Sequence, residues 1–442
     1  MADFNLFWKD KDSDAGIIGT YFNAENMGIV HPSVNSLNEQ FIVPAPSNNR
    51  GFVLKGGTFI KILQPDGSGG YNHLVFGSDA DTVVAYTEQR LDTGVSFTPG
   101  RDYYIYLCLQ APAQAGQLPT ATLVVSLNST FPSGYNADNS RKIGGFHTLC
   151  LAVGSISGHP LSGMNAGDIL PASFWDLWHR PTCSPEGMVY VSELDFWADI
   201  YLQSGSGANT RSYYGGTITD NQTYSQHIED LFKVGKNPLS DEEFQCAAEG
   251  SNQKTNIQGS ADPVTTGGHL NTAGRRMISN YGLEDCAGAM WQWLSGWGTR
   301  IDAAPFNVWT EDANKGSVIY TTALLAGGHW GDGANCGSRC RNANNSRLNV
   351  NANNGCQGQA RIRGAMQLRL NNTAMFRTPR SKTQNGGAAG LVCTAESHAA
   401  HYCGAHEKAR KPISSDNRQG QPCPCLQTGP ARQATAAQHS PI

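Results

Sequence analysis

The stretch that most constrains this chain is an asparagine-rich segment from Gly327 to Gly358, GGHWGDGANCGSRCRNANNSRLNVNANNGCQG. Seven of the 13 residues from Asn342 to Asn354 are Asn. So few apolar side chains, with neither a helical nor a strand period, cannot build a core. Asn amides both donate and accept hydrogen bonds and cost little entropy to order. The segment is therefore suited to display on a surface.

Larger side chains interrupt this polar run at intervals. We expect Trp330, Arg339 and Arg347 to act as scaffold anchors that hold the backbone of the segment in place. A buried Arg can satisfy loop carbonyl groups that would otherwise lack a hydrogen-bond donor. The alternative is a freely moving Asn-rich loop, and the regular placement of the anchors argues against it.

The residues GGHW followed by GSRCRNANNSRLNVNANNG closely resemble the variable region of proteins that are diversified by retroelements. In that family a C-type lectin fold presents side chains that are rewritten at Asn codons, while the scaffold stays constant. The segment Gly282–Trp293, GLEDCAGAMWQW, matches the family's G-x-x-D-x-x-G-x-x-x-x-W pattern. The resemblance covers residues 180–370 well and the N-terminal half more loosely.

The resemblance also implies which residues bind a ligand. The candidate patch consists of small, amide or polar residues between the anchors: His329, Gly331, Asp332, Asn335, Asn342, Asn344, Asn345, Asn349, Asn351, Asn353 and Asn354. Trp291 and Trp293, together with Trp297, are expected to belong to the scaffold, because indoles mostly pack in cores or interfaces. Asp285 either ligates a structural cation or, as we favour, caps a turn by accepting backbone N–H bonds. No cofactor is expected.

Composition narrows the class of protein further. A chain of 442 residues with 50 Gly and only 15% charged residues favours two or three loop-rich, β-leaning domains. The net charge of −4, without a basic run, favours neither nucleic acid nor an anionic membrane as a partner. The chain contains no run of 18 apolar residues, so no membrane insertion is expected. The N-terminus lacks the pattern of a secretory signal.

The 12 cysteines allow several roles. Cys108, Cys150 and Cys246 stand in apolar contexts that are typical of buried thiols. Disulfides are possible among Cys286, Cys336, Cys340 and Cys356, although the sequence assigns no pairs. A chain made in the cytoplasm would keep all of them reduced.

We predict a mainly β fold with an α+β C-terminal part, in four regions. Residues 1–50 form a β-rich segment, which the resemblance implies is a trimerisation segment, and 51–165 form a β-sandwich. Residues 166–370 form the C-type lectin domain, and 371–442, without apolar periodicity, are expected to be disordered. The sandwich is predicted from six β-rich runs separated by turn signals: 52–54, 59–63, 82–86, 103–109, 122–127 and 148–153.

Two helices and a closing strand are predicted for the C-terminal part. Ile228, Leu231 and Phe232 form the apolar stripe of a helix over Tyr224–Val234. A capping box that begins at Ser240 should start a second helix, which continues through Ala248. The alternating residues of Arg363–Leu370 are expected to form the last strand.

The remaining tail contains residues of metal-binding type. Cys393, His398, His401, Cys403 and His406 follow one another closely, but their spacing matches no standard zinc pattern. We therefore predict no metal site in the tail.

Two alternatives to the display function are weaker. An oxidase that resembles formylglycine-generating enzyme needs two cysteines at positions that fall on Asp332 and Gly337, whereas Cys336 and Cys340 are out of step. A calcium-dependent sugar site needs Glu-Pro-Asn or Gln-Pro-Asp triplets and a Trp-Asn-Asp run, none of which occurs. Sugar recognition by another route stays open, since Asn amides and a Trp face suit hydroxyls and pyranose rings.

The favoured interpretation is a hypervariable receptor-binding protein at the tip of a phage tail fibre. Its expected partners are a host cell-surface protein or glycan and other tail-fibre proteins. A homotrimer would present three patches and gain avidity. The expected location is the virion, and the alternative is a bacterial surface-displayed variable protein.

Overall fold

The computed structural model describes residues 4–11, 29–30, 40–85, 90–93, 96–112, 114, 117–303 and 317–362. The chain divides into two compact units, Met1–Thr378 and Pro379–Ile442, and every described residue belongs to the first. The tail with its Cys and His residues, the run Gly16–Phe22 and the expected strand Arg363–Leu370 lie outside the described residues.

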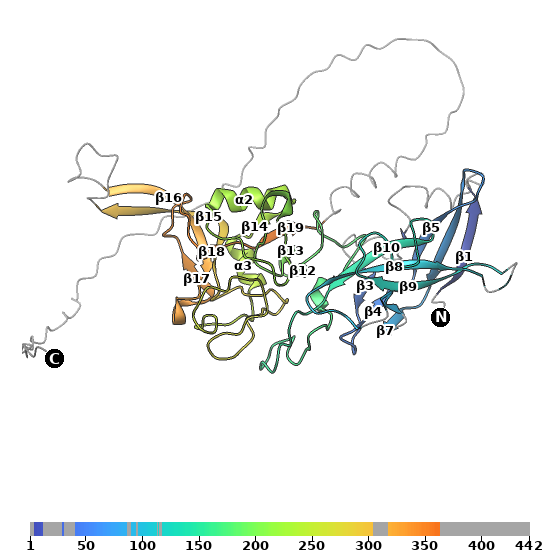
Figure 1. Ribbon diagram of the computed structural model, residues 1–442, viewed down its shortest axis with the longest axis horizontal. Helices are drawn as coiled ribbons and strands as arrows, with labels where there is room; N and C mark the ends of the chain where they lie inside the picture. Colours follow the sequence, from blue (N-terminus) through green and yellow to red (C-terminus); the bar gives the residue numbers. More distant parts are fainter. Residues whose placement is uncertain are drawn as a thin grey trace, which may run out of the picture. The chain divides into compact units, whose positions relative to one another are not determined.

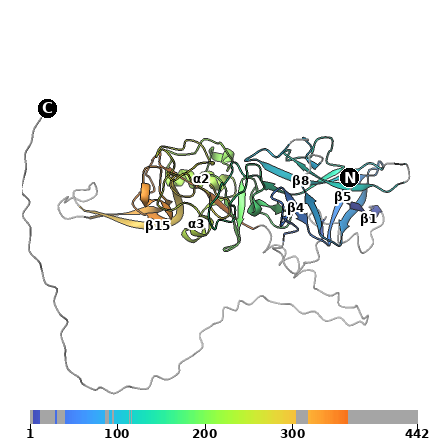
Figure 2. The same cartoon turned by 90° about the horizontal axis from the view of Figure 1, so that it is seen from below.

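The N-terminal half forms two antiparallel sheets (Figures 1 and 2). The larger sheet has eight strands in the order β11-β10-β8-β9-β1-β6-β5-β2, and the smaller has three in the order β3-β4-β7. The strands are β1 Phe4–Lys11, β2 Ile29–Val30, β3 Ile42–Pro44, β4 Gly51–Leu54, β5 Thr58–Pro65, β6 Tyr71–Ser78, β7 Thr82–Ala85, β8 Asp102–Gln110, β9 Thr120–Ser126, β10 Ser140–His147 and β11 Trp175–Asp176.

A hydrophobic core lies between these two sheets. Phe52 and Val84 of the smaller sheet are buried in one cluster with Ile62, Phe76 and Ile105 of the larger sheet. Two sheets that share one core form a sandwich. The predicted sandwich and the mainly β class are thus both present.

Strand β8 is buried on both faces, which explains why its sequence from Tyr103 to Leu109 does not alternate between apolar and polar residues. Ile105 and Leu107 face the sandwich core, whereas Tyr104 and Tyr106 belong to a second cluster with Trp197 of the C-terminal domain. Successive strand residues point to opposite faces, so a strand buried on both faces cannot alternate. The second cluster joins the sandwich to the next domain.

The C-terminal domain combines two four-stranded sheets with two helices (Figure 1). One sheet has the order β12-β13-β19-β14 and the other β17-β16-β15-β18, in which β15 and β18 run parallel. Their strands are β12 Met188–Val191, β13 Phe196–Asp199, β14 Asn237–Pro238, β15 Trp291–Ala303, β16 Ser317–Gly327, β17 Gly337–Asn342, β18 Asn354–Gly355 and β19 Gly358–Arg361.

The two expected helices are present, although Phe232, which was expected on the apolar stripe of the first, is 58% exposed. Helix α2 spans Tyr224–Lys233 and α3 spans Asp241–Ala247. The capping box at Ser240 is confirmed, because its side chain accepts the Glu243 N–H and Glu243 in turn accepts the Ser240 N–H. An equivalent box at Thr223, which we did not predict, starts α2.

The observed strand pairing crosses the region boundaries that we expect at residues 50 and 165. β3 pairs with β4 across residue 50, and β1 pairs with β6 and β9, so the first 50 residues contribute strands to the sandwich. Strand β11 pairs with β10, which carries the sandwich past residue 165. The strand expected over 148–153 is wrong, since this stretch has only an isolated bridge from Thr148 to Ile169, followed by bends. The strands β6 and β10 were not expected.

None of the helices within the described ranges is long and apolar enough to cross a membrane.

Candidate functional site

The Asn-rich segment contributes β17 and β18 to the sheet that also contains β15 and β16. Gly327 and Gly328 introduce it with φ angles of 93° and 84°, a region that favours glycine. A Cβ on Gly327 would lie 2.4 Å from the Cys286 carbonyl oxygen, so a side chain has no room there. The Gly-Gly pair therefore turns the chain out of β16 and into the display segment.

Trp330 anchors the first part of the segment. Its ring is half-buried between two apolar clusters, one with Leu202 and Met290 and the other with Ile257. Its N–H donates to the Ala289 carbonyl at 3.1 Å, and its own carbonyl accepts a hydrogen bond from the Asn256 amide. Both the side chain and the backbone of Trp330 are thus fixed.

His329 and Asp332 form a compact turn around Trp330. The His329 N–H donates to Asp332 Oδ2 at 2.8 Å, and the Gly331 N–H donates to His329 Nδ1 at 2.8 Å. Because Nδ1 accepts, the proton of the neutral ring is on Nε2, which lies 3.5 Å from Asp332 Oδ1. These two side chains shape the turn as well as lining the candidate patch.

Backbone hydrogen bonds from three elements hold the second part of the segment. Its carbonyl groups accept N–H bonds from β16, from the start of α2 and from β15. The pairs are Ala323 to Asn345 at 3.2 Å, Tyr224 to Arg347 at 3.2 Å and Trp291 to Asn353 at 2.9 Å. The backbone is therefore fixed by main-chain contacts, which leaves most side chains available for display.

Arg347 anchors the segment from an exposed position. Its guanidinium lies 4.4 Å from the centre of the Tyr224 ring, and that ring packs edge-on against Trp293. A cation over an aromatic face is attracted by the ring quadrupole. Arg347 thus contacts the scaffold through a surface ring contact, whereas we had expected a buried Arg that satisfies carbonyl groups.

Most residues of the candidate patch lie at the surface. Gly331, Asn335 and Asn344 are exposed, and His329, Asp332, Asn342, Asn345, Asn349, Asn351 and Asn353 are half-buried. Two of the amides also stabilise local turns: Asn342 Oδ1 accepts the Asn344 N–H at 2.7 Å, and Asn351 Oδ1 accepts the Asn353 N–H at 3.5 Å.

The assignment of Asn354 to the patch is wrong. Asn354 is fully buried, because it lies in β18 and pairs with Trp291 of β15. Among the described residues, neither Nδ2 nor Oδ1 of its side chain has a hydrogen-bond partner, and neither atom reaches the surface. Asn354 is therefore removed from the candidate patch.

The assignment of Arg339 as a buried anchor is also wrong. Arg339 is exposed, whereas Arg341, two residues later in β17, makes the contacts expected of an anchor. Arg341 pairs with Asp241 of α3 and donates to the Ser338 carbonyl at 2.7 Å. The sequence does not distinguish the two arginines, because only the position of α3 selects one of them.

The three tryptophans of β15 differ in exposure. Trp291 and Trp293 are buried, as expected of scaffold residues, but Trp297 is 73% exposed. The pairing of β15 with β16 is irregular between Trp293 and Trp297, after which the two strands extend as a ribbon (Figure 1). Leu348 and Val350 are also exposed, so apolar side chains accompany the amides of the segment.

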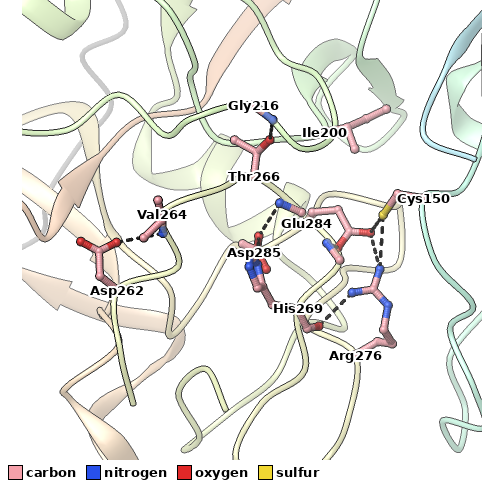
Figure 3. A network of polar contacts seen from close by, with 12 residues as sticks. Cys150, Ile200, Gly216, Asp262, Val264, Thr266, His269, Arg276, Glu284 and Asp285 are labelled. Atoms are coloured by element: carbon pink, nitrogen blue, oxygen red, sulfur yellow. Dashed lines mark hydrogen bonds and ion pairs between the residues drawn. The ribbon is translucent and has the colours of Figure 1, made fainter. Parts of the chain in front are cut away.

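Asp285 accepts a backbone N–H bond, as the favoured alternative expects, but from the distant residue Gly267 and not from a local turn. Its Oδ2 accepts the Gly267 N–H at 2.9 Å and contacts His269 Nδ1 at 2.8 Å (Figure 3). Next to it the buried pair Glu284 and Arg276 is joined at 2.7 Å. Within the described ranges, no group of three or more His, Cys, Asp or Glu residues is placed to hold a metal ion.

The cysteines near the segment are thiols. All eight cysteines in the described part of the chain are free, so the possible disulfides among Cys286, Cys336, Cys340 and Cys356 are not formed there. Burial, with Asp332 adding to it, raises the pKa of Cys336 to about 12 and that of Cys340 above its usual value. A thiol with a raised pKa is a poor nucleophile at neutral pH, which disfavours the oxidase alternative.

A mainly β chain that ends in a lectin-like domain, with an amide-rich segment fixed by its backbone, defines a class of display proteins. Residues 46–176 match the family model described as the Mtd second domain. The tail fiber receptor-binding protein of Bordetella phage BPP-1 is 29% identical over 283 residues, which cover 58% of this chain and 70% of that protein.

Solved structures point to the same relatives. The U1 and I1 variants of the Major Tropism Determinant each superpose with a TM-score of 0.57 at 26% sequence identity. Each match covers 76% of this chain and 85% of the other. The chain is therefore similar to the major tropism determinants in sequence and shares their C-type lectin fold.

Proposed function

We propose that this chain is the receptor-binding, tropism-determining protein of a phage tail fibre and that it acts by recognition alone. The observation that carries this proposal is the construction of the segment from His329 to Asn353. Its backbone is bound to β15, β16 and α2, while the side chains of its patch residues are exposed or half-buried. Such a surface can change its side chains without changing its fold.

The relatives support this proposal through what they are described to do. The Bordetella phage protein is a tail-fibre receptor-binding protein, and the solved structures are variants of one tropism determinant. By analogy we place this chain in the virion, at the tip of the fibre, with a host surface molecule and other tail-fibre proteins as partners.

We further propose that retroelement mutagenesis varies the patch from His329 to Asn353. The proposal is based on the high frequency of Asn in this segment, because adenine-rich Asn codons are the targets in the family that the segment resembles. The test is genomic. An adenine-rich repeat of this coding region next to a reverse-transcriptase gene would support the proposal, and a locus without either would contradict it.

The receptor-binding function is tested by changing side chains of the patch together. Replacing Asn335, Asn345 and Asn349 by Tyr should abolish binding of the purified chain to its host cells. The melting midpoint should stay within about 2 °C, because surface changes alter stability little. The matched control makes the same change at Asn128 and Asn209, two exposed Asn residues of other loops.

The outcome separates recognition from folding. Loss of cell binding in the patch variant alone supports the proposal. Unchanged cell binding by the patch variant would contradict it, as would unfolding of the domain, because the patch would then be part of the scaffold.

A further inference from the structure

A cavity beside the display patch has no role in the function proposed above. It has a volume of about 410 Å³ and lies in the loop between Ile257 and Leu270. Ile257, Pro263 and Leu270 provide apolar surface, and Gln258, Asp262 and His269 provide polar groups. An apolar wall with a few convergent polar groups is typical of a small-ligand site.

His269 is held in one orientation at this cavity. Its Nδ1 contacts Asp285 Oδ2 at 2.8 Å, and its carbonyl accepts a hydrogen bond from Arg276 at 2.8 Å (Figure 3). The Asp285 side chain is 1% exposed, whereas the His269 side chain is 20% exposed. Since Nδ1 is occupied, Nε2 is the ring atom left to bind a ligand.

Asp262 offers a second polar group. Its Oδ1 accepts the Val264 N–H at 3.0 Å, which fixes the carboxylate and leaves Oδ2 without a hydrogen-bond donor among the described residues. A hydroxyl group can donate to this oxygen. It can also donate to a neutral His269 or accept from a protonated one, so hydroxyl ligands suit both protonation states of the ring.

The cavity and the display patch share a wall. Ile257 packs with Trp330, and the preceding residue, Asn256, donates its amide to the Trp330 carbonyl. None of the residues that line the cavity belongs to the candidate patch. A receptor on the patch can therefore place one more group in a cavity whose residues do not vary with the patch.

We infer that this cavity is a binding subsite for an uncharged monosaccharide unit. Hydroxyl groups of the sugar would bind His269 Nε2 and Asp262 Oδ2, and the apolar face of its ring would pack on Ile257 and Leu270. The carboxylate of Asp262 selects against acidic sugars, because two like charges repel each other at short range. Sugar binding itself is independent of the proposed function, whereas its use in host recognition rests on that function.

Saturation-transfer NMR on the full chain tests this inference. The probes are the methyl glycosides of glucose, galactose, mannose and N-acetylglucosamine, and the methyl glycoside of sialic acid serves as the acidic comparison. At least one neutral glycoside should receive saturation, and the sialoside should not. Saturation of the sialoside alone, or of no glycoside, overturns the inference.

Three variants locate the binding within the cavity. His269→Asn keeps a donor for Asp285 but lacks Nε2, and Asp262→Asn removes the charge. Each should weaken binding about tenfold, the effect of one lost hydrogen bond to a charged or oriented group. Ala261→Trp should block the cavity and abolish binding. Asn128→Ala, a change in an exposed loop of the sandwich, is the control and should bind the glycoside as the natural chain does.

Two results distinguish this inference from the proposed function. Glycoside binding that persists in Ala261→Trp, with an unchanged melting midpoint, overturns the cavity even if the patch variant loses its host cells. Glycoside binding that Ala261→Trp abolishes supports the cavity even if the patch variant still binds host cells.

Discussion

At the scale of single residues, Trp330 and Arg339 show that the position of a side chain in the fold decides whether it anchors the segment or is exposed on its surface. Trp330 contacts two apolar clusters and makes two backbone hydrogen bonds, whereas Arg339 is exposed on β17. An anchor contributes to folding because its removal leaves both a void and unpaired polar groups.

We therefore expect Trp330→Ala to lower the free energy of unfolding by about 2 kcal/mol, less than for a fully buried Trp. Arg339→Ala should change it by less than about 0.5 kcal/mol. Urea unfolding of both variants measures the difference. Equal effects of the two substitutions would show that Trp330 is not an anchor.

His227 makes stability depend on pH. It is fully buried in α2, with Nδ1 at 3.0 Å from Gln203 Oε1, and burial lowers its pKa from 6.5 to about 4. The folded state therefore keeps the ring neutral, while the unfolded chain takes up a proton below pH 6.5. The contribution is fully present above pH 6.5 and is lost as the pH falls towards 4.

The loss from this one histidine should reach about 3 kcal/mol, since one pKa unit corresponds to about 1.4 kcal/mol. Unfolding curves at pH 6.5 and pH 4 for the natural chain and for His227→Asn measure it. Asn keeps a donor for Gln203 but does not titrate. If both chains lose the same stability on acidification, His227 does not contribute to the pH dependence.

At the scale of elements, helix α3 forms ion pairs with two strands of the C-terminal domain. Its Asp241 pairs with Arg341 of β17, and its Glu243 binds Arg361 of β19 at 2.5 Å. Glu243 also completes the capping box with Ser240. The start of this short helix therefore holds the strand that carries part of the display segment.

Ser240→Ala should lower the free energy of unfolding by about 1 kcal/mol, the usual effect of losing a helix cap. Thr223→Ala at the cap of α2 is a matched comparison and should have a similar effect. Chemical denaturation gives both values. No shift of the midpoint in either variant would mean that the caps are replaced by water without loss.

At the scale of the whole molecule, the sandwich and the C-terminal domain are joined by a shared apolar cluster. Tyr104 and Tyr106 of β8 pack with Met188 and Trp197. Polar contacts reinforce the join: Asp102 accepts the Gly187 N–H at 2.9 Å, and His147 Nε2 contacts the Tyr201 hydroxyl at 3.0 Å. The sandwich and the C-terminal domain therefore meet in a packed interface.

We expect the full chain to form a homotrimer through residues 1–165, which would give three display patches and hence avidity. Multi-angle light scattering should give three times the chain mass of 47.5 kDa. A chain that starts at residue 180 has lost the sandwich, so it should be monomeric if it folds. A monomeric full-length chain would contradict the prediction.

The sequence by itself determined the features that depend on local composition and spacing. These include the capping box at Ser240 and the helix that begins at Tyr224. A cap, a turn or an amphipathic stripe involves residues only a few positions apart, so its physical requirements are visible in the chain.

Only the tertiary structure decided which members of a local pattern are buried. Asn354 is buried by its pairing with β15, Arg341 replaces Arg339 because α3 lies within its reach, and Trp297 is exposed on the ribbon beyond the core. The cavity beside Trp330 likewise requires the fold of the loop from Ile257 to Leu270. Each of these depends on contacts between residues far apart in the chain, and short-range periodicity carries no information about such contacts.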